Sequence, residues 1–501
     1  MTESSMPSEW HKTTLGAVAQ WGSGGTPSRK NPDYYGGNVP WVKTGDLGPK
    51  VLSAASEYIT ELGVQKSSAK YFPKGSVAIA MYGATIGKTS ILGFDATTNQ
   101  ACAVGQPVDG ITDTTFLYYL LRNEKDAFIA KGKGGAQPNI SQTLIKEHGI
   151  ALPPLAEQKV IADKLDTLLA QVENTKARLE RIPHILKRFR QSVLAAAVSG
   201  RLTGDFSASD HNYYHAVDQD IAEDKKLVKI QAPKVDEIEL AKELFESPDW
   251  HRWKLYALEQ LVESSRGIPY GIVQTGEAQD DGIPTIRCGD VKPLLVETKS
   301  LKKVLPEIEE KYARTRLKGG EVVLAIRGTV GNAAVISEEL AAHPLNISRE
   351  VAMIPIRKNI SSQYVALLLQ SPGGYGALAE KTKGVAQRGI NLADVKRLVT
   401  PLPTLSEQTE IVRRVDQLFA HADRIEQQVH NALARVNNLT QSILAKAFRG
   451  ELTEQWRKDN PELISGENSA EALLERIKAE RAAQKPAGRR TKIRKTEQAA
   501  K

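Results

Sequence analysis

The phrase LPPLAEQ at residues 152–158 returns as LPTLSEQ at residues 402–408, which is 402 − 152 = 250 residues further along a chain of 501. The stretch after each phrase also ends alike, with QSVLAAAVSGRLT in the first copy and QSILAKAFRGELT in the second. An internal repeat of this kind constrains the architecture more than any local pattern does. The sequence therefore predicts a chain built of two related halves.

Between the two ends of each copy, apolar residues recur alternately four and three positions apart, which is the seam of a coiled coil. Each helix is expected to end near a left-handed glycine, Gly200 or Gly450. Any long core helix needs an apolar stripe, but two matched seams in one chain favour pairing with each other. The predicted helix–helix seam includes Ile161, Leu165, Leu168, Val172, Leu179, Ile411, Val415, Leu418, Ile425 and Val429.

The segments that precede the two helices share a fainter framework. VPWVKTGDL at 39–47 faces IPTIRCGDV at 283–291, and short β-branched runs alternate with Gly, Pro and Asn turns in both halves. We expect a mixed α/β domain in each half, and the divergence between the halves suggests similar work on different targets. The predicted parts are 1–151 and 249–401 for the two domains, 152–203 and 402–453 for the helices, 204–248 for a charged linker, and 454–501 for a charged tail with a short helix.

Composition narrows the class of protein. Cys102 and Cys288 are the only cysteines, too few for a disulfide framework, so a cytoplasmic location is expected. No stretch approaches the roughly 18 apolar residues of a membrane span, so no membrane partner is expected. The net charge of +8 fits a polyanionic partner without requiring one.

Three motifs approach patterns of catalytic or nucleotide-binding sites without completing them. GATIGKT at 83–89 has three residues between its glycines, whereas a phosphate-binding loop has four. NPDY at 31–34 resembles the NPPY of adenine methyltransferases but lacks the second proline. Asp46 and Asp290 lie in matched GD pairs without the further acidic residue and lysine of a nuclease. We therefore expect no catalytic residue and no metal site.

Glycine-rich loops in both halves instead carry polar and basic side chains of the kinds that contact phosphates and base edges. For each of them, the alternative is an ordinary solvated loop residue. In the first half the candidate DNA-binding residues are Thr26, Ser28, Arg29, Lys43, Thr44, Tyr82, Lys133, Gln137 and Asn139. In the second half they are Arg266, Arg287, Arg327, Lys383, Gln387, Arg388 and Asn391.

The ordered, duplicated layout of these motifs resembles the specificity subunit of type I restriction–modification enzymes. The carriers are the two LP phrases, the GRLT and GELT helix ends, the WVKTGDL and TIRCGDV strands, the GGAQPNIS and VAQRGIN loops, and the tail EALLERIKAER. The resemblance covers nearly the whole chain except 204–248. It implies an α+β fold in which two target recognition domains are separated by two long antiparallel coiled-coil helices, with a pseudo-twofold internal repeat.

The same resemblance implies that each domain reads one half of a bipartite, asymmetric target in double-stranded DNA. Two modification subunits would dock and methylate adenine N6, and restriction subunits would add translocation and cleavage. Those partners, and not this chain, would bind S-adenosylmethionine, ATP and Mg. Two alternatives remain open: a coiled-coil scaffold that binds proteins without reading DNA, and a stand-alone DNA adenine methyltransferase.

Overall fold

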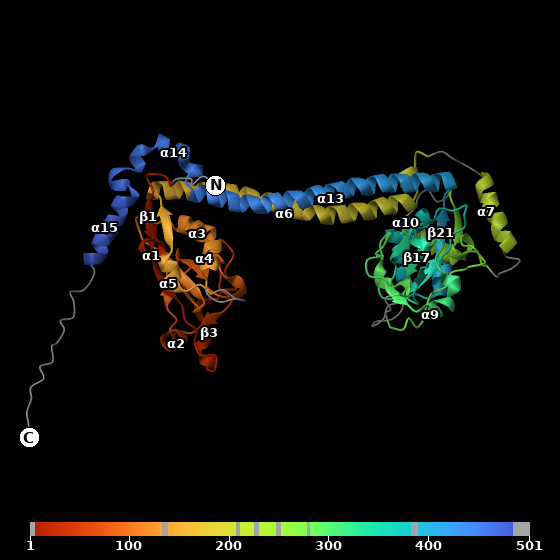
Figure 1. The fold of residues 1–501 in the computed structure, drawn as a ribbon, viewed down its shortest axis with the longest axis horizontal. Helices are drawn as coiled ribbons and strands as arrows, with labels where there is room; N and C mark the ends of the chain where they lie inside the picture. Colours follow the sequence, from red (N-terminus) through yellow and green to blue (C-terminus); the bar gives the residue numbers. More distant parts are fainter. Residues whose placement is uncertain are drawn as a thin grey trace, which may run out of the picture. The chain divides into compact units, whose positions relative to one another are not determined.

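The computed structural model of the chain describes residues 6–132, 139–206, 211–224, 230–246, 252–277, 281–381 and 389–483. The chain divides into two compact units. Unit 1 comprises residues 1–179 and 431–501, and unit 2 comprises residues 180–430. Each unit contains one mixed α/β module and a part of both long helices (Figure 1).

The two long helices are α6, Leu155–Val198, and α13, Leu405–Phe448. Each is followed by a glycine in the left-handed conformation, as the sequence predicted. The φ angle is 84° at Gly200 and 78° at Gly450. A side chain disfavours this conformation, so glycine allows the chain to turn sharply away from the helix axis.

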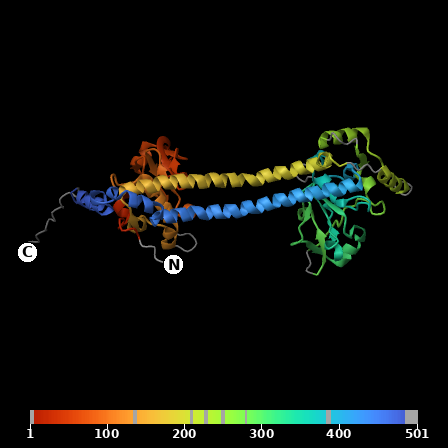
Figure 2. The ribbon, with the colours of Figure 1, turned by 90° about the horizontal axis from the view of Figure 1, so that it is seen from above.

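The helices pair in opposite directions within each unit. In unit 1 the first part of α6 packs against the last part of α13, where Leu165 and Leu444 belong to one buried core. In unit 2 the last part of α6 packs against the first part of α13, where Val193 and Val415 share a core. The two views in Figures 1 and 2 show α6 and α13 side by side. The pairing is therefore antiparallel, as the family resemblance implied.

The residues predicted for the helix–helix seam are all at least half-buried. Leu169 and Leu444 are buried as well, although they lie outside the predicted seam. Both belong to the core of unit 1 together with residues of the module, so the helices bury a wider face there than a coiled coil alone would. Of the predicted residues, Ile161, Leu165, Val172, Ile411, Val415 and Val429 are buried, and Leu168, Leu179, Leu418 and Ile425 are half-buried.

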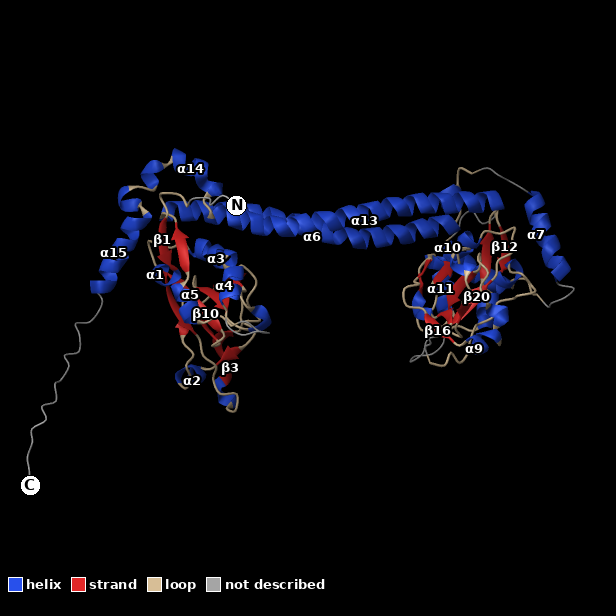
Figure 3. Ribbon diagram, in the orientation of Figure 1, coloured by secondary structure: helices blue, strands red, loops and turns tan. Residues whose placement is uncertain are grey.

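Within its described residues, the module of unit 1 contains three sheets and five short α-helices; strands are drawn in red and helices in blue in Figure 3. The first sheet pairs β1 (His11–Thr14) with β11 (Gly149–Leu152). The second has the order β2 (Ala19–Ser23), β10 (Cys102–Pro107), β7 (Val77–Ala80), β8 (Thr89–Leu92) and β4 (Val51–Leu52). The third has the order β5 (Tyr58–Ile59), β3 (Tyr35–Val42), β9 (Ala96–Thr98) and β6 (Tyr71–Phe72). The helices are α1 (Leu15–Val18), α2 (Glu61–Gln65), α3 (Thr114–Asn123), α4 (Lys125–Lys131) and α5 (Gln142–Glu147).

The module of unit 2 repeats the central pairings of the first module. Its β12 (Lys254–Ala257) pairs with β21 (Val399–Leu402), as β1 pairs with β11. One sheet has the order β16 (Lys302–Val304), β13 (Ile283–Ile286) and β19 (Asn346–Ile347), and another has the order β18 (Ala333–Val335), β17 (Val322–Ala325) and β20 (Val351–Ile354). A further pair joins β14 (Val291–Lys292) to β15 (Leu295–Val296). The helices of this module are α9 (Pro306–Glu310), α10 (Ser362–Gln370), α11 (Pro372–Glu380) and α12 (Leu392–Lys396).

The segment 204–248 is not the simple charged linker that its composition suggested. It contains two helices, α7 (His211–Asp224) and α8 (Val235–Phe245). Val217 and Ile221 of α7, and Ala241 and Phe245 of α8, are buried in the core of unit 2. In each helix the two buried residues are four positions apart, so one face packs while the abundant charges remain on the other. The high proportion of polar residues hid this spacing.

The tail after the second long helix contributes to unit 1. It contains α14 (Glu454–Asp459) and α15 (Ala470–Ala483). Leu473 and Leu474 of α15 are buried in the same core as α3 and α6. The tail is thus part of the packing of the first module rather than only a charged extension.

Candidate nucleic-acid interface

A buried glutamate opens each long helix and joins segments that are distant in the sequence. Glu157, which has no exposed surface, accepts hydrogen bonds from Trp10 Nε1 at 2.9 Å and Thr453 Oγ1 at 2.6 Å. Its carboxylate also lies 2.5 Å from Arg457 Nη1. The end of α13 is therefore fastened to the start of α6 within unit 1.

Unit 2 contains the reciprocal joint. Glu407 accepts hydrogen bonds from Trp253 Nε1 at 3.0 Å and from Thr203 Oγ1 at 2.8 Å, with Arg252 Nη2 at 3.7 Å. Here the end of α6 is fastened to the start of α13. We call these two joints the glutamate hubs. They explain why each copy of the LP phrase requires its glutamate and each helix end its threonine.

The glutamine that follows each hub glutamate ties the module to the long helix. Gln158 Oε1 accepts from the backbone N–H of Asp113, the residue whose side chain caps α3. Gln408 Oε1 accepts from the N–H of Ser361, which caps α10. Because a cap residue fixes where its helix begins, each glutamine sets the central helix of its module against the long helix.

In the first module the predicted loop is held by aromatic side chains. Trp41 Nε1 donates to the carbonyl of Gly25 at 2.9 Å, and Tyr35 Oη donates to the carbonyl of Pro27 at 2.6 Å. The Arg29 guanidinium lies over the Tyr35 ring at 4.2 Å from its centroid. The loop is thus fixed by three aromatic contacts, and its polar residues Thr26 and Ser28 remain exposed.

Glu57 bonds to two of the predicted DNA-binding residues. It pairs with the guanidinium of Arg29 through two oxygens and with Lys43 Nζ at 3.0 Å. The hydrogen bonds from Arg29, followed by those from Lys43, lower the pKa of Glu57 to about 2 although partial burial opposes this shift. The carboxylate is therefore charged at neutral pH and holds both cations on one patch.

In the second module the predicted residues have diverse settings. Arg287 pairs with Asp290 at 3.1 Å and donates to the carbonyl of Ser300. Arg327 is exposed, and its backbone forms an isolated antiparallel β-bridge with Gly389. Asn391 is exposed, and its side chain caps α12 by accepting from Ala393 N–H at 3.2 Å.

Arg266 has a more buried setting than the exposed loop position predicted for it. Its Nη2 lies 2.7 Å from the buried carboxylate of Glu321, and its side chain is only 16% exposed. It also donates to the carbonyl of Arg316 at 3.2 Å. The sequence could not distinguish this buried pairing from an exposed loop arginine, because its partner lies 55 residues away (321 − 266). Arg266 is thus held by a buried carboxylate, and its contact with DNA stays a prediction.

The remaining candidates divide between exposed positions and positions outside the described residues. Thr44 is half-exposed, and Tyr82 and Asn139 are exposed. Lys133, Gln137, Lys383, Gln387 and Arg388 all lie outside the described residues.

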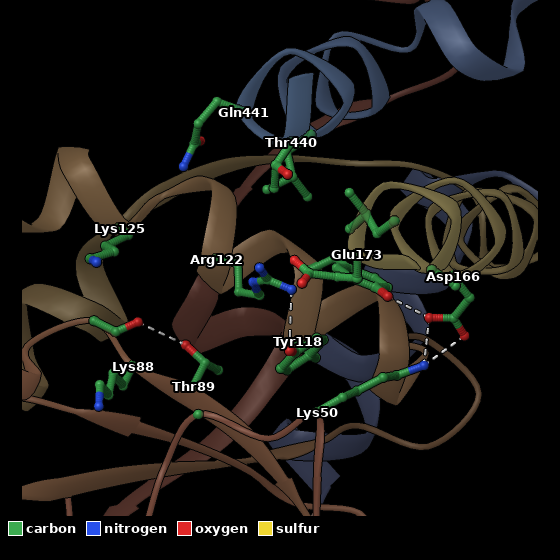
Figure 4. Close-up of a pocket in the computed structure, with 16 residues that line it drawn as sticks. Lys50, Lys88, Thr89, Tyr118, Arg122, Lys125, Asp166, Glu173, Thr440 and Gln441 are labelled. Carbon is green, nitrogen blue, oxygen red and sulfur yellow. Dashed lines mark hydrogen bonds and ion pairs between the residues drawn. The ribbon is translucent and has the colours of Figure 1, made fainter. Parts of the chain in front are cut away.

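A basic cavity of about 720 Å³, shown in Figure 4, lies between the module of unit 1 and the parts of α6 and α13 in that unit. Lys50 Nζ pairs with Asp166 at 2.5 Å, and Tyr119 Oη donates to the same carboxylate. Lys88 and Lys125 lie on the opposite side of the cavity from Asp166 (Figure 4). With Arg122 there are four cations against two carboxylates, so the cavity favours an anionic group.

The sequence did not reveal this cavity because its four cations come from three separate stretches, around residues 50, 88 and 122–125. Only Lys88 stood out, as part of GATIGKT. In the structure residues 83–85 form a single 3₁₀ turn between β7 and β8, and Gly87 has a φ of 75°. The motif serves a strand-to-strand turn that brings Lys88 to the cavity.

The other near-motifs have structural explanations. Asn31 accepts from Asp33 N–H at 3.2 Å and so caps a 3₁₀ turn, Pro32–Tyr34. Asp46 accepts from Lys43 N–H at 2.9 Å, and Asp290 accepts from Arg287 N–H at 2.8 Å. The matched GD pairs thus close the same loop in both modules.

The described residues contain neither a cluster of metal ligands nor a helix that could span a membrane. Within the ranges that the structure describes, no three His, Cys, Asp or Glu side chains gather as a metal site. Among the same residues, no helix is both long and apolar enough to cross a bilayer.

Comparison with known proteins agrees with this architecture. A family model described as the type I restriction modification DNA specificity domain matches residues 7–184 and 251–435. The EcoBI specificity subunit of Escherichia coli is 46% identical over 74% of this chain and 72% of its own length. The EcoKI specificity subunit of Escherichia coli K12 is 35% identical over 89% of each chain, and the StySPI subunit of Salmonella potsdam is 33% identical over 96% of this chain and 97% of its own.

Solved structures show the same fold at lower identity. A chain from a study of assembly and conformational transition in a type I R-M system has a TM-score of 0.62 and 18% identity, covering 89% of this chain and 99% of that one. The HsdS subunit from Thermoanaerobacter tengcongensis has a TM-score of 0.53 and 18% identity, covering 89% and 98%.

Two related modules, each carrying polar loops and each joined to antiparallel helices by a glutamate hub, define a protein with two recognition modules. The chain belongs to the family of type I restriction–modification specificity subunits. These subunits recognise DNA targets and take part in the assembly of the type I complex.

Proposed function

We propose that the two modules read the two halves of one bipartite, asymmetric site in double-stranded DNA. The observation that carries the proposal is where the modules agree and where they differ. The hubs and the GD loops are built alike, whereas the side chains presented beside those loops differ in charge and partner. Modules that share the hubs and GD loops but carry different side chains beside them would recognise two different half-sites.

Arg29, Lys43 and Arg287 are the described residues best placed for this reading. They lie on exposed or half-exposed loops and are oriented by carboxylates. Arginine and lysine donate to the O6 and N7 atoms of guanine in the major groove. Each half-site is therefore expected to contain at least one position read by a cation.

The proposal extends to the partners. Modification subunits would dock on the helices and the adjoining surfaces and methylate adenine N6, and restriction subunits would complete the complex. S-adenosylmethionine, ATP and Mg would be bound by those partners, and the chain itself would be a non-catalytic subunit. The hubs support this because, within each unit, their buried contacts fasten the module and the two helix ends together.

The test is a map of methylated sites made by the assembled modification complex with wild-type chain, Arg29→Ala or Arg287→Ala. Arg29→Ala should relax the first half-site and Arg287→Ala the second, each by about 1–3 kcal/mol at the base concerned. The untouched half-site is an internal control in each variant. Relaxation of both halves by either variant, or of neither by both, would contradict reading by separate modules.

The two alternatives predict different outcomes. A protein-binding scaffold would support assembly with partners but would give no sequence-selective DNA binding in the complex. A stand-alone methyltransferase would transfer labelled methyl groups to DNA without partners. The wild-type chain, assayed alone and with a modification subunit, separates all three functions.

A further inference from the structure

The strand registers of the two modules allow residues to be matched across them. In the first module Val39 pairs with Ile59, and in the second Ile283 pairs with Val304. Glu57 lies two residues before Ile59, and its carbonyl accepts a hydrogen bond from Trp41 N–H. Lys302 lies two residues before Val304 and pairs with Thr285. Glu57 and Lys302 therefore occupy the same place on the third sheet and its counterpart.

A pair of glycines matches the neighbouring loops. A Cβ atom on Gly24 would lie 1.8 Å from the carbonyl oxygen of Thr98, and one on Gly271 would lie 1.8 Å from that of Ile347. Thr98 and Ile347 in turn occupy matched positions, since they pair with Val42 and Ile286. Both loops thus pass the sheet at the same point, where only glycine fits.

Five residues beyond these glycines, the two loops differ in charge. The first module has Arg29, which binds Glu57, and the second has Gly276. Lys302 Nζ donates to the carbonyl of Gly276 at 2.6 Å and to Thr275 Oγ1 at 2.9 Å. A carboxylate that holds an arginine side chain in one module is thus replaced by a lysine that holds the loop backbone in the other.

The geometry of Arg29 shows what the carboxylate achieves. Glu57 binds the Nη1 and Nη2 atoms, and the ring of Tyr35 covers one face of the guanidinium. Glu57 thus approaches the guanidinium end-on. Among the described residues, no carboxylate pairs with its other edge, which is formed by Nε and Nη2, and the side chain is 57% exposed. That edge presents two parallel N–H donors, which match the two acceptors on the major-groove edge of guanine.

Side-chain entropy gives this arrangement its value. A free arginine has many rotamers, and it must lose them when it binds a base. Glu57 and Tyr35 fix the guanidinium before DNA binds, so the loss of side-chain entropy does not reduce the binding free energy. Lys43 Nζ lies 3.0 Å from Glu57 Oε2, the oxygen that also accepts from Arg29 Nη2, so the same carboxylate holds both cations.

We infer that Glu57 is a positioning residue for target reading, because it orients Arg29 and Lys43 toward the first half-site. In the second module Lys302 occupies the matched position and holds the loop backbone instead. The inference rests on the proposed function, because it presupposes that the first module reads DNA. Glu57 itself does not touch a base in this arrangement. Its negative charge opposes binding to phosphate in general while its hydrogen bonds sharpen the choice of base.

The experiment compares Glu57→Ala with wild type in the assembled modification complex, using DNA randomised in each half-site and unrelated DNA. Discrimination at one or two positions of the first half-site should fall by about 5- to 150-fold. Affinity for unrelated DNA should stay the same or rise, because a carboxylate near the phosphates has been removed. The second half-site should be read as before.

Two further variants make the result specific. Glu61→Ala is the matched control. The carboxylate of Glu61 is in the same module, but it accepts a hydrogen bond from Tyr71 Oη, at 2.6 Å, and not from Arg29. This variant should keep wild-type selectivity. Glu57→Gln retains the shape and one acceptor, so it should fold even if Glu57→Ala does not, and should lose part of the discrimination.

Three outcomes overturn the inference: unchanged selectivity in both Glu57 variants, an equal loss of affinity for all sequences, or an equal effect of Glu61→Ala. If the wild-type complex itself shows no selectivity, the proposed function fails instead. The two failures are therefore distinguishable in one set of measurements.

Discussion

In both units a tryptophan and a threonine donate hydrogen bonds to the glutamate that opens a long helix, but the third partner differs. In unit 1 Arg457 lies 2.5 Å from Glu157 and is 10% exposed. In unit 2 Arg252 lies 3.7 Å from Glu407 and is 29% exposed. The hubs thus share their geometry but not their charge pairing. Further from the hubs the divergence grows, until Glu57 in one module stands where Lys302 stands in the other.

This gradient shows how a duplicated protein separates stability from specificity. The buried tryptophan, glutamate and threonine have fixed partners, so a change in one leaves another unpaired in the interior. The loop residues are exposed, and a change there leaves the core intact. Divergence can therefore accumulate at the exposed loop positions while the buried contacts of the hubs stay the same.

The largest difference between the modules should appear on removal of the hub glutamates. Glu157→Ala removes the close carboxylate from a nearly buried Arg457, which keeps only Thr453 at 3.1 Å and Glu9 at 4.0 Å, and it leaves the indole N–H of Trp10 without its acceptor, so unit 1 should lose about 3–5 kcal/mol of unfolding free energy. Glu407→Ala should cost unit 2 about 1–3 kcal/mol, because Arg252 is more exposed and more distant. Hydrogen exchange followed by mass spectrometry measures each unit separately. Equal losses of unfolding free energy would show that the arginine at each hub, Arg457 or Arg252, does not contribute to the difference between the units.

A smaller difference is expected at a matched pair of aspartates, Asp166 on α6 and Asp416 on α13. Asp166 accepts from Lys50 and from Tyr119, and Asp166→Ala should cost unit 1 about 1 kcal/mol because the ion pair is partly exposed. Burial raises the pKa of Asp416 above its ordinary value of 3.8. Asp416→Asn should therefore change stability by less than about 0.5 kcal/mol.

The pH dependence gives the sign of the Asp416 effect. Because its folded pKa is raised, the folded chain keeps this proton longer than the unfolded chain, so stability falls as pH rises through that range. Asp416→Asn should be slightly more stable than wild type at pH 7, with the advantage vanishing toward pH 4. Urea midpoints of unit 2 at both values test this, and an advantage that grows on acidification would refute it.

The smallest expected difference concerns the two cysteines. Burial raises the pKa of Cys102 in the first module to about 12, whereas Cys288 in the second is only half-buried and donates to Glu350 at 3.2 Å. At pH 8 a thiol reagent should modify Cys288 slowly and Cys102 only after unit 1 unfolds. Mass spectrometry of timed samples decides the order, and faster labelling of Cys102 would contradict the packing of the first module.

The sequence was informative where a pattern repeats over many residues. The 250-residue offset and the apolar seam predicted two modules and two paired helices, because a helix face must recur along the chain. It was uninformative where a contact joins single distant residues. Glu57 and Lys302 could be matched only through strand register, and the pairing of Arg266 with the buried Glu321 could be seen only in the structure. The helices in 204–248 were missed because each buries only a few apolar residues among many charges.

The reciprocal hubs have a consequence for the ancestry of the chain. A half-length protein with one module and one helix would carry a glutamate at the start of its helix and a threonine at the end, and a single straight helix cannot bring its own end to its own start. Two identical copies lying head to tail would satisfy both hubs at once, as Thr453 satisfies Glu157 and Thr203 satisfies Glu407 here. Such a pair is symmetric, so its two modules are identical. Joining the two copies in one chain frees each module to diverge alone, and differences such as Glu57 in one module against Lys302 in the other follow from the loss of that symmetry.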